Sequence, residues 1–485
     1  MQQFKVLIIG SGFGGLCSAL RLIKANIDDF LILERRDFMG GTWCQNTYPG
    51  AAVDVQSPLY SIASEPYDWS QMFAHQDELN TYTNYVIDKH KLHNKCRLNA
   101  NVSKIEWLND PALWQISLAD GTVLLTQFVI NASGPLSTPK EPDFTGKHLF
   151  TGVSFHTNNW DHNFDYKDKN VAVIGSGASA AQVIPEIASK VKKLHVFQRT
   201  PHWVIKRPDH KFSSKQRKLL KRPLIQKLLR TAIYWALEYR VLGFKYSKNL
   251  LDLIAGNEAR RFIKKQVKDK SLREKLTPDF TIGCKRVILS NTFYPALCRD
   301  NVVLHDKNDS IDSINEAGIN TVNQQQIDLD LIIYATGYDA TDGVISYPVI
   351  GYKGKSLQEY WHPFPRAYLG TTIPNFPNLF IVTGPNTGIG HTSAIFIIES
   401  QINYIINAIR QVDLLGKNVV EVTATAEQRY TDLIHTEMDK TVWKTGGCNS
   451  WYQSNSGHVI AMFPGFSFTY RRWTKHFKFQ DHIFY

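Results

Sequence analysis

The sequence is poor in cysteine and lacks any long hydrophobic run. Its six cysteines are scattered over 485 residues, with no C-x-x-C pair and no metal-ligand spacing. This pattern argues against a disulfide framework, a zinc site and a dithiol flavoenzyme. A membrane-spanning helix needs roughly 18 consecutive apolar residues, and no such window occurs. Residues 4–9 already form a strand-like run that leaves no room for a signal peptide, so we expect a soluble, cytoplasmic protein.

The excess of basic residues is confined to one part of the chain. Lys and Arg number 55 and Asp and Glu number 44, which gives a formal net charge of +11. Residues 206–275 contain 21 basic and 6 acidic side chains, a local charge of +15, so the rest of the chain carries −4. No base-reading module accompanies this segment, and we therefore expect no nucleic-acid partner. A solvated basic face on helices accounts for the excess.

Two segments repeat one pattern of strand, glycine-rich turn, helix and strand. The first is residues 4–34, which read FKVLIIG, SGFGG, LCSALRLIKAN and FLILE. The second is residues 170–200, which read NVAVIG, SGASA, AQVIPEIASKV and KLHVFQRT. Each matches the βαβ unit that binds a dinucleotide at the start of its helix. Because both glycine loops are intact, two bound dinucleotides explain the repeat better than one working site and one dead copy.

The first glycine loop contains Gly10, Gly12 and Gly15. In this motif the first glycine allows a tight turn, the second lets the backbone approach a pyrophosphate, and the third lets helix and strand pack closely. The phosphates then meet the free N–H groups of the helix N-terminus. Glu34 stands 24 positions after Gly10, where a carboxylate can accept hydrogen bonds from ribose hydroxyls.

The second glycine loop differs from the first at the far end of its unit. Gly175 and Gly177 fill the first two glycine positions, and Ala180 fills the third. Arg199 stands 24 positions after Gly175, at the place that Glu34 takes in the first unit. A carboxylate there would repel a 2′-phosphate, whereas a guanidinium holds it through two hydrogen bonds. We therefore predict NADPH rather than NADH at the second site, and FAD at the first.

The order of these patterns predicts an α/β fold with two Rossmann-like dinucleotide-binding domains and a helical insertion. After residue 204 the sequence becomes basic and helix-prone, and strand-like runs return near residue 286. The expected segments are the FAD-binding domain at 1–145 and 335–485, the NADPH-binding domain at 150–208 and 283–334, and the insertion at 209–282.

Two further motifs carry a resemblance to a known family. Residues 150–161, FTGVSFHTNNWD, fit F-x-G-x-x-x-H-x-x-x-W-[PD] at every fixed position. Residues 40–54, GGTWCQNTYPGAAVD, fit a companion pattern that ends at Asp54. With these motifs the chain resembles the class B flavoprotein monooxygenases of the flavin-containing monooxygenase superfamily over nearly its whole length, and within them the type I Baeyer–Villiger branch. Trp160 favours this branch, because N- and S-oxygenating relatives usually carry Tyr or Phe there.

The resemblance implies a catalytic cycle and two catalytic residues. NADPH reduces FAD, O2 adds at the flavin C4a atom, and the resulting peroxyflavin attacks a ketone to give an ester or lactone. An anionic peroxide of this kind needs a fixed cation and the exclusion of water. The GCKR run matches the family's flavin-side arginine at Arg286, and Asp54 matches the carboxylate that pairs with it.

The resemblance also implies the cofactor contacts. Lys285, Arg199 and Thr200 match residues that hold the 2′-phosphate of NADPH, and Trp451 resembles a tryptophan that contacts the nicotinamide nucleotide or the substrate. His156 and Trp160 belong to the link between the domains, so we interpret them as structural. The expected cofactor-binding residues are Gly10, Gly12, Gly15, Glu34, Gly41, Thr42, Trp43, Asp54, Tyr60, Gly175, Gly177, Ser179, Arg199, Thr200, Lys285 and Trp451.

Three other functions stay open at this point. The same flavin peroxide, once protonated, oxygenates sulfides or amines, so heteroatom oxygenation is an alternative to ketone oxidation. An uncoupled NADPH oxidase would release H2O2, but the matches at Asp54 and Arg286 speak against it. A non-catalytic nucleotide sensor predicts one degraded site, whereas both glycine loops are intact.

The basic insertion suggests a further partner. Its segment LIQKLLRTAIYWALEYRVLGF mixes apolar and basic residues. This composition suits peripheral contact with a membrane surface, or attraction of an amphiphilic anionic substrate. The alternative is that the segment packs on the nucleotide-binding domain.

Overall fold

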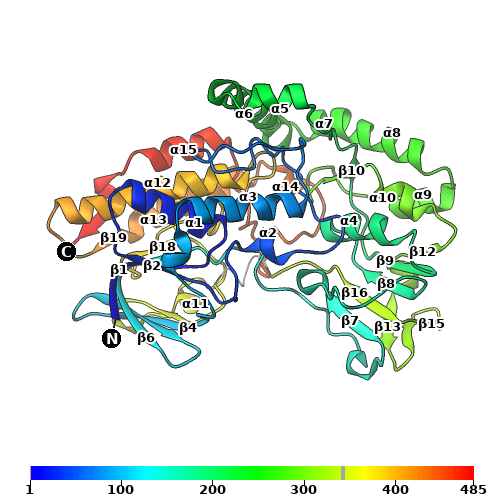
Figure 1. Ribbon diagram of the computed structural model, residues 1–485, viewed down its shortest axis with the longest axis horizontal. Coiled ribbons are helices and arrows are strands. Elements are labelled where there is room, and N and C mark those ends of the chain that lie inside the picture. Colours follow the sequence, from blue (N-terminus) through cyan, green and yellow to red (C-terminus); the bar gives the residue numbers. More distant parts are fainter. Residues whose placement is uncertain (1, 340–344) are drawn as a thin grey trace.

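The chain folds around two β-sheets that stand side by side (Figure 1). The computed structural model describes residues 2–339 and 345–485. The sheet at the left of Figure 1 takes its strands from both ends of the chain, and the sheet at the right takes them from the middle. The helices between residues 214 and 276 run along the top and upper right of the molecule.

The first sheet consists of β1 (Gln2–Ile9), β2 (Phe30–Leu33), β3 (Cys96–Arg97), β4 (Val102–Leu108), β5 (Leu113–Leu118), β6 (Val123–Asn131), β17 (Val349–Ile350) and β18 (Leu379–Ile381). Its order is β17-β4-β5-β6-β1-β2-β3, with β18 paired to β6. The pairs from β6 through β1 and β2 to β3 are parallel, and β4, β5 and β6 form an antiparallel meander. Val6, Leu7 and Ile8 are fully buried, as expected of a parallel strand covered on both faces.

Five helices cover this sheet and its edges: α1 (Phe13–Lys24), α3 (Gln76–Lys89), α12 (Ala394–Leu414), α13 (Ala424–Met438) and α15 (Ser467–Lys475). In α12 the side chains of Ile395, Ile402, Ile405 and Ile409 recur at helical spacing and are fully buried. Ser393 begins this helix by accepting a hydrogen bond from the Ile395 N–H. The apolar stripe therefore orients α12 toward the core of the first sheet.

The second sheet is wholly parallel and has the order β12-β9-β8-β16-β7. Its strands are β7 (Val153–His156), β8 (Asn170–Ile174), β9 (Lys193–Phe197), β12 (Val302–His305) and β16 (Leu331–Tyr334). Helices α4 (Ala178–Ile187) and α10 (Phe293–Leu297) pack in the same core. The remaining strands are β10 (Val204–Ile205), β11 (Ile288–Leu289), β13 (Ile311–Ile314), β14 (Gly318–Thr321), β15 (Gln326–Asp328), β19 (Val420–Val422) and β20 (His482–Phe484).

The helical insertion contains α5 (Ser214–Leu220), α6 (Pro223–Glu238), α7 (Lys248–Leu251), α8 (Asn257–Gln266), α9 (Lys270–Leu276) and the π-helical turns η4 (Leu242–Tyr246) and η5 (Asp252–Gly256). All of them fall within the predicted range 209–282, while the bounds of the five predicted segments stay predictions. In the described part of the chain, no helix is both long and apolar enough to cross a bilayer.

The cysteine pattern argues against a disulfide framework, and the structure corrects this expectation at one pair. Cys284 and Cys448 form a disulfide with their Cα atoms 6.1 Å apart, although 164 residues separate them in sequence. Sequence spacing gave no sign of this bond, because the two segments meet only in the folded chain. The other four cysteines, Cys17, Cys44, Cys96 and Cys298, are free.

Candidate active site

Two glycine segments meet at the N-terminus of α1. A Cβ on Gly41 would lie 2.6 Å from the Gly12 Cα, and Gly41 has a φ of +63°, so glycine is required there. The Gly40 N–H donates to the Ser11 carbonyl at 3.2 Å and ties the segments together. Gly12 caps α1 without a side-chain hydrogen bond, which leaves N–H groups of the first turn for a phosphate. The resulting backbone-lined cradle fits the pyrophosphate of FAD.

The helix of the first unit lies against its strand only because Gly15 has no side chain. A Cβ there would lie 1.9 Å from the Gly10 carbonyl oxygen. Glu34, at the end of β2, is buried, and its Oε2 accepts hydrogen bonds from the Ser11 N–H at 3.0 Å and the Ser11 hydroxyl at 2.6 Å. Its Oε1 accepts from the Arg36 N–H at 3.0 Å. A carboxylate oxygen has two lone pairs, so Oε1 can also take a ribose hydroxyl.

Three aromatic side chains, Phe13, Trp43 and Tyr60, lie beside the first glycine loop. Trp43, in the short helix α2 (Thr42–Gln45), donates its Nε1–H to the Tyr60 hydroxyl at 3.1 Å. The Tyr60 ring also meets Phe13, the first residue of α1, edge-on with 5.9 Å between ring centroids. Burial raises the pKa of Tyr60, so its hydroxyl stays protonated at neutral pH. The predicted residues Trp43 and Tyr60 therefore lie together next to the glycine loop, and Thr42 begins the helix that carries Trp43.

Asp54 and Arg286 form an ion pair between the two halves of the molecule. The Arg286 Nε–H donates to Asp54 Oδ2 at 2.5 Å, and an Nη2 contact to the same oxygen strengthens the pair. The Asp54 carboxylate raises the pKa of Arg286, so the guanidinium is a fixed positive charge. The Arg286 side chain remains 44% exposed in the free protein, which leaves part of it open to a ligand. Tyr60 and Tyr452 both lie within its electrostatic reach.

The second glycine loop opens toward free space. A Cβ on Gly177 would meet no heavy atom within 4 Å, whereas one on Gly175 would lie 2.3 Å from the Ala335 carbonyl oxygen. Gly177 precedes α4 without a side-chain cap, and Ser179 lies in the first turn of that helix. The Ser176 hydroxyl donates to the Thr200 carbonyl at 2.8 Å, which holds the segment after β9 beside the loop. The loop thus offers a second phosphate cradle.

Two cations lie together at the far end of this second unit. Burial lowers the pKa of Lys285, and the nearby Arg199 lowers it further by charge repulsion. His202 is also close, because burial and then Lys285 lower its pKa to about 4. Such like charges gain from an anion placed between them. The arrangement suits the 2′-phosphate of NADPH, as the sequence predicts for Arg199 and Lys285.

Hydrogen bonds join the two sheets close to the glycine loops. The Tyr48 hydroxyl donates to Gln182 Oε1 at 2.9 Å, and Gln182 Nε2 donates to the Ala52 carbonyl at 2.9 Å. Gln182 lies in α4, so this link connects the loop at 40–54 to the helix of the second nucleotide unit. Burial raises the pKa of Tyr48 to about 12 and keeps its hydroxyl a donor.

The motif at residues 150–161 takes part in the same junction. Asn158 donates to the Tyr338 hydroxyl at 3.1 Å, and Tyr338 in turn donates to Asn46 Oδ1 at 2.9 Å. His156 accepts from the Asn158 N–H at 3.0 Å, and Trp160 is buried against Phe155. These contacts agree with a structural role for His156 and Trp160.

Residues 448–462, which we call the C-terminal loop, border the site near Arg286. Trp451 is 43% exposed and meets Tyr452 edge-on at 4.6 Å, whereas Tyr452 is buried. The Cys284–Cys448 disulfide fixes this loop to the segment that carries Arg286. Asn386 donates to the carbonyls of Val459 and Met462 at 3.0 and 3.1 Å and anchors the end of the loop to the first domain.

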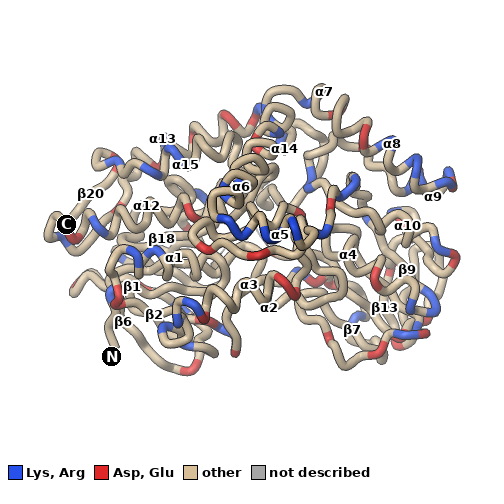
Figure 2. The backbone as a smooth tube through the Cα atoms, turned by 45° about the horizontal axis from the view of Figure 1, so that its top comes forward, with Lys and Arg blue, Asp and Glu red and all other residues tan. Residues whose placement is uncertain are grey.

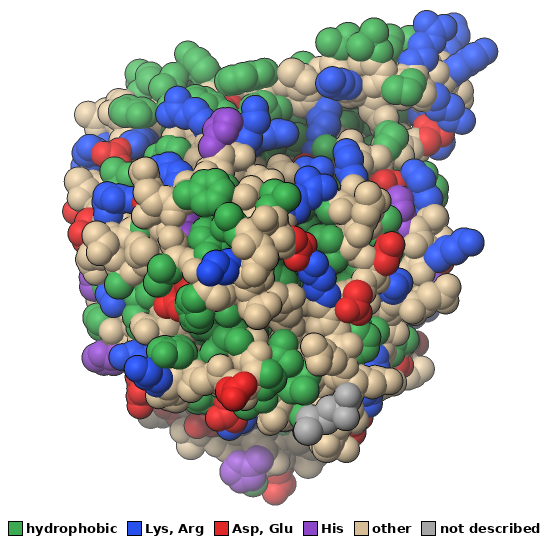
Figure 3. Space-filling model, turned by 90° about the vertical axis from the view of Figure 1, so that its left-hand side faces the viewer, with side chains coloured by type: hydrophobic (Ala, Val, Ile, Leu, Met, Phe, Trp, Pro, Cys, Tyr) green, Lys and Arg blue, Asp and Glu red, His purple; other side chains and the backbone are tan. Residues whose placement is uncertain are grey.

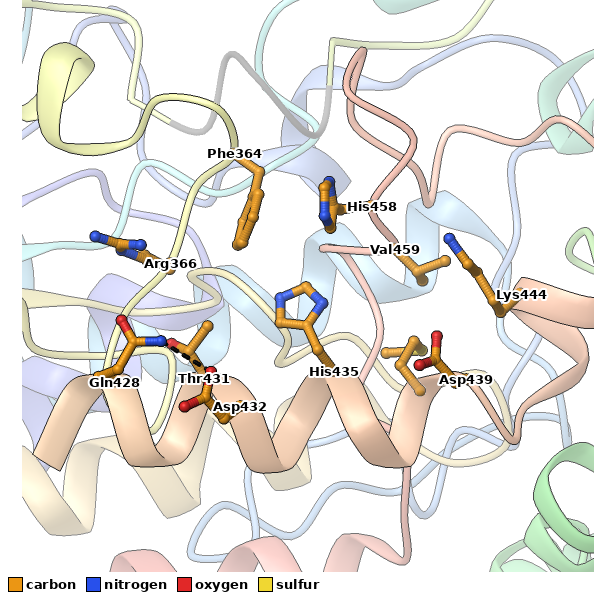
Figure 4. A pocket seen from close by; sticks show the side chains of 11 residues that line it. Phe364, Arg366, Gln428, Thr431, Asp432, His435, Asp439, Lys444, His458 and Val459 are labelled. Carbon is orange, nitrogen blue, oxygen red and sulfur yellow. Dashed lines mark hydrogen bonds between the residues drawn. The ribbon is translucent and has the colours of Figure 1, made fainter.

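A separate cavity of about 280 Å³ lies between α13 and the C-terminal loop (Figure 4). Phe364, His435 and His458 stand over it, with Arg366 and Lys444 at its two ends. None of its lining residues is one of the predicted site residues. We therefore do not assign it to the active site.

Three residues near the site were not predicted from the sequence. Tyr452 lies close to Arg286, His202 lies close to Lys285, and Arg207 lies within electrostatic reach of Asp54. The position of Tyr452 beside the predicted Trp451 was the one available signal. His202 and Arg207 belong to no motif that the sequence displays.

Comparison with known proteins shows which family the chain resembles. A family model described as pyridine nucleotide-disulphide oxidoreductase matches residues 7–233. Since the chain has no C-x-x-C pair, this match concerns the nucleotide-binding pattern. A Baeyer-Villiger monooxygenase of Pseudomonas aeruginosa is 42% identical over 479 residues, which cover 98% of this chain and 90% of the relative.

Solved structures extend the comparison to the fold. The structure of OTEMO in complex with FAD and NADP is 26% identical and superimposes with a TM-score of 0.89 over 99% of both chains. Cyclohexanone monooxygenase from Rhodococcus sp. Phi1, bound to NADP+, is 25% identical with a TM-score of 0.90, covering 100% of this chain and 99% of that one. These findings confirm the predicted resemblance, fold class and cofactors. The chain belongs to the Baeyer–Villiger monooxygenase family, whose members are NADPH-dependent flavoprotein monooxygenases.

Proposed function

We propose that the enzyme oxidises small ketones to esters or lactones with NADPH and O2. One oxygen atom of O2 enters the bond next to the carbonyl carbon, and the other leaves as water while NADPH becomes NADP+. The Asp54–Arg286 pair is the observation that carries this proposal, because it is a fixed cation within electrostatic reach of Tyr60, which lies beside the first glycine loop. The name of the similar cyclohexanone monooxygenase supports a ketone as the substrate class.

Each part of the site has a proposed task. FAD, when bound, accepts hydride from NADPH and activates O2. Arg286 supplies positive charge where anionic oxygen develops, and Asp54 orients it. We assign FAD binding to Gly10, Gly12, Gly15, Glu34, Gly41, Thr42, Trp43 and Tyr60, and NADPH binding to Gly175, Gly177, Ser179, Arg199, Thr200, Lys285 and Trp451.

The alternative function is oxygenation of sulfides or amines by the same site. The two reactions differ in the protonation state of the flavin peroxide: heteroatom oxygenation uses the protonated form. The positive charge of Arg286 favours the anion and so opposes this alternative. An uncoupled NADPH oxidase is a further alternative.

The proposed partners are O2, a ketone or sulfide and, through the insertion, a lipid surface. The use of NADPH by the enzyme supports a cytoplasmic site of action.

The test is a product analysis with labelled oxygen. FAD-loaded enzyme would be given NADPH, ¹⁸O2 and a panel of ketones and sulfides, and the products would be identified by mass. Esters or lactones with one ¹⁸O atom support the proposal. Sulfoxides alone would support the heteroatom alternative, and H2O2 equal to the NADPH consumed throughout would indicate an oxidase.

A further inference from the structure

Helix α6 carries an apolar stripe on the face that points away from the protein. Leu224, Leu228, Trp235 and Tyr239 are 68%, 60%, 55% and 72% exposed. Their spacing of four, seven and four residues places all four on one side of the helix. Large apolar side chains gathered in this way on a surface mark a site of interaction.

The exposure of this stripe follows from how α6 is anchored. Arg230 donates to the Pro58 carbonyl and to the Ser61 hydroxyl, each at 2.9 Å. Tyr234 stacks on Phe396 with ring centroids 4.9 Å apart. These contacts fix the opposite face of α6 on the first domain, so the stripe cannot turn inward. Packing on a nucleotide-binding domain thus accounts for one face of α6. The other face stays largely exposed, although the Trp235 ring of the stripe contacts the Phe468 ring.

The apolar surface continues into the neighbouring turns. Among the described residues, twenty large hydrophobic side chains are classed as exposed, and nine of these lie within residues 219–254. They include Leu253 and Ile254, which are 64% and 62% exposed. Helices α5 and α6 pack on each other at the top of the molecule, and η4, α7 and η5 follow α6 in the chain (Figure 1). We call the exposed apolar side chains of residues 219–254 the insertion face.

Positive charge surrounds the insertion face. Residues 213–256 contain ten Lys or Arg and two Asp or Glu. Four of the basic side chains pair with acids outside this segment: Arg217 and Lys221 with Asp68, Arg230 with Glu399, and Lys245 with Glu437. The other six, Lys215, Lys218, Arg222, Lys227, Arg240 and Lys248, make no ion pair with a described residue and supply the net positive charge. Of the two acids, Glu238 is buried and Asp252 is paired with Arg260. Figure 2 shows Lys and Arg along α5 and α6, and Figure 3 shows hydrophobic and basic side chains intermixed along the upper edge of the molecule. No free acidic group of residues 213–256 therefore opposes an anionic partner.

We infer that the insertion face docks on the surface of an anionic phospholipid bilayer. Leucine and isoleucine side chains gain by entering the acyl boundary, and lysines gain by meeting acidic headgroups. A second copy of the chain would bring the same positive charge to the contact and be repelled. Nucleic acid would satisfy the charge but offer no place for the aliphatic side chains. The lipid surface alone complements both properties.

The benefit of membrane binding to the enzyme rests on the proposed function. Apolar ketones concentrate in bilayers, so an enzyme held there meets its substrate at a higher local concentration. Lipid binding itself does not depend on the reaction. A test of binding therefore fails or succeeds separately from a test of monooxygenation.

The experiment is sedimentation of FAD-loaded enzyme with sucrose-filled vesicles. Vesicles of phosphatidylcholine with about 30% phosphatidylserine are expected to carry the enzyme into the pellet at low salt, and vesicles of phosphatidylcholine alone much less. Binding should weaken by about fivefold for each basic residue lost near the surface, as in Lys218→Ala or Lys227→Ala. Raising the salt concentration should release the enzyme.

Variants separate the insertion face from exposed apolar side chains in general. Leu224→Ser with Leu228→Ser should lower binding at least tenfold, while Leu414→Ser, at a residue 76% exposed at the end of α12, should leave it unchanged. Retained FAD and the parental melting temperature show that the variants are folded. Equal binding by the double variant and the parent would overturn the inference. So would a dimer in sedimentation velocity that the double variant dissolves, since that would assign the face to self-association.

Discussion

Asp54 and Arg286 stand 232 residues apart in the sequence and share a hydrogen bond of 2.5 Å in the fold. Because Asp54 keeps the guanidinium charged and oriented, we predict that Arg286→Ala sharply lowers the rate of oxygenated product formation while FAD stays bound. The loss of one preorganised cation at a developing anion lowers kcat by about 10²–10³-fold. Rates of product formation and of H2O2 release would be measured together. Arg286→Lys should recover part of the activity, and full activity in the alanine variant would contradict the assigned role.

The second prediction concerns the cation pair of Arg199 and Lys285. A phosphate bound between them would attract both cations and offset their mutual repulsion. Arg199→Ala should therefore raise KM for NADPH about 10- to 100-fold and leave KM for NADH nearly unchanged, because NADH has no 2′-phosphate. Steady-state kinetics with both nucleotides give the ratio. Arg261→Ala, an exposed arginine of α8, is the matched control. An equal rise for both nucleotides would place Arg199 outside the 2′-phosphate site.

A third prediction tests the FAD cradle. Gly41→Ala adds a Cβ that would lie 2.6 Å from the Gly12 Cα, so the two glycine segments must separate. We expect the purified variant to lose most of its FAD, measured by absorbance and by titration with added FAD. Gly121→Ala also has a positive φ, but its Cβ would meet no atom within 4 Å. It should keep FAD, and equal retention by both variants would show that the contact is not needed.

The disulfide leads to a fourth prediction. A cross-link between residues 164 apart stabilises the fold by about 5 kcal/mol in the chain-entropy model, an upper value for a real protein. Cys448→Ser should therefore lower Tm by several degrees, and a dithiol reductant should do the same to the parent but not to the variant. Calorimetry with and without reductant measures both. Cys298→Ser, at an exposed free cysteine, should leave Tm unchanged.

The fifth prediction concerns acid stability. Burial, with a smaller contribution from His305, lowers the pKa of His195 from 6.5 to about 4 in the folded protein. The unfolded chain then binds the proton more readily, so the free energy of unfolding falls as the pH drops from about 6.5 to about 4, by up to about 3 kcal/mol. His195→Gln should flatten this part of a pH series of urea melts. His148→Gln, at an exposed histidine, should not, and an unchanged slope in His195→Gln would reject the assignment.

The parts of the fold set by local pattern were predictable from the sequence. Glycine spacing predicted two strand–turn–helix units, and the structure has both, at β1–α1 and β8–α4. The 24-residue offset to Glu34 and Arg199 predicts a different ligand for each unit. Family motifs predicted Asp54 and Arg286 as a pair, and the two side chains form a hydrogen bond in the structure. The domain boundaries and the roles of the site residues stay predictions.

Contacts between distant segments were not predictable. The approach of Tyr452 to Arg286 and the Cys284–Cys448 bond depend on how the C-terminal loop returns to the site. No local periodicity or motif encodes that path. The exposure of the α6 stripe likewise depended on which face the first domain would cover, and the sequence left both outcomes open.

The link through Gln182 has a mechanical consequence. Its side chain grips the loop at 40–54 at two points, Tyr48 and Ala52, while its backbone belongs to α4. A rotation of the second sheet therefore pulls on the segment that leads to Asp54 unless both hydrogen bonds break. The Gln182 side chain thus couples the position of α4, at the predicted NADPH loop, to the position of the segment that carries Asp54.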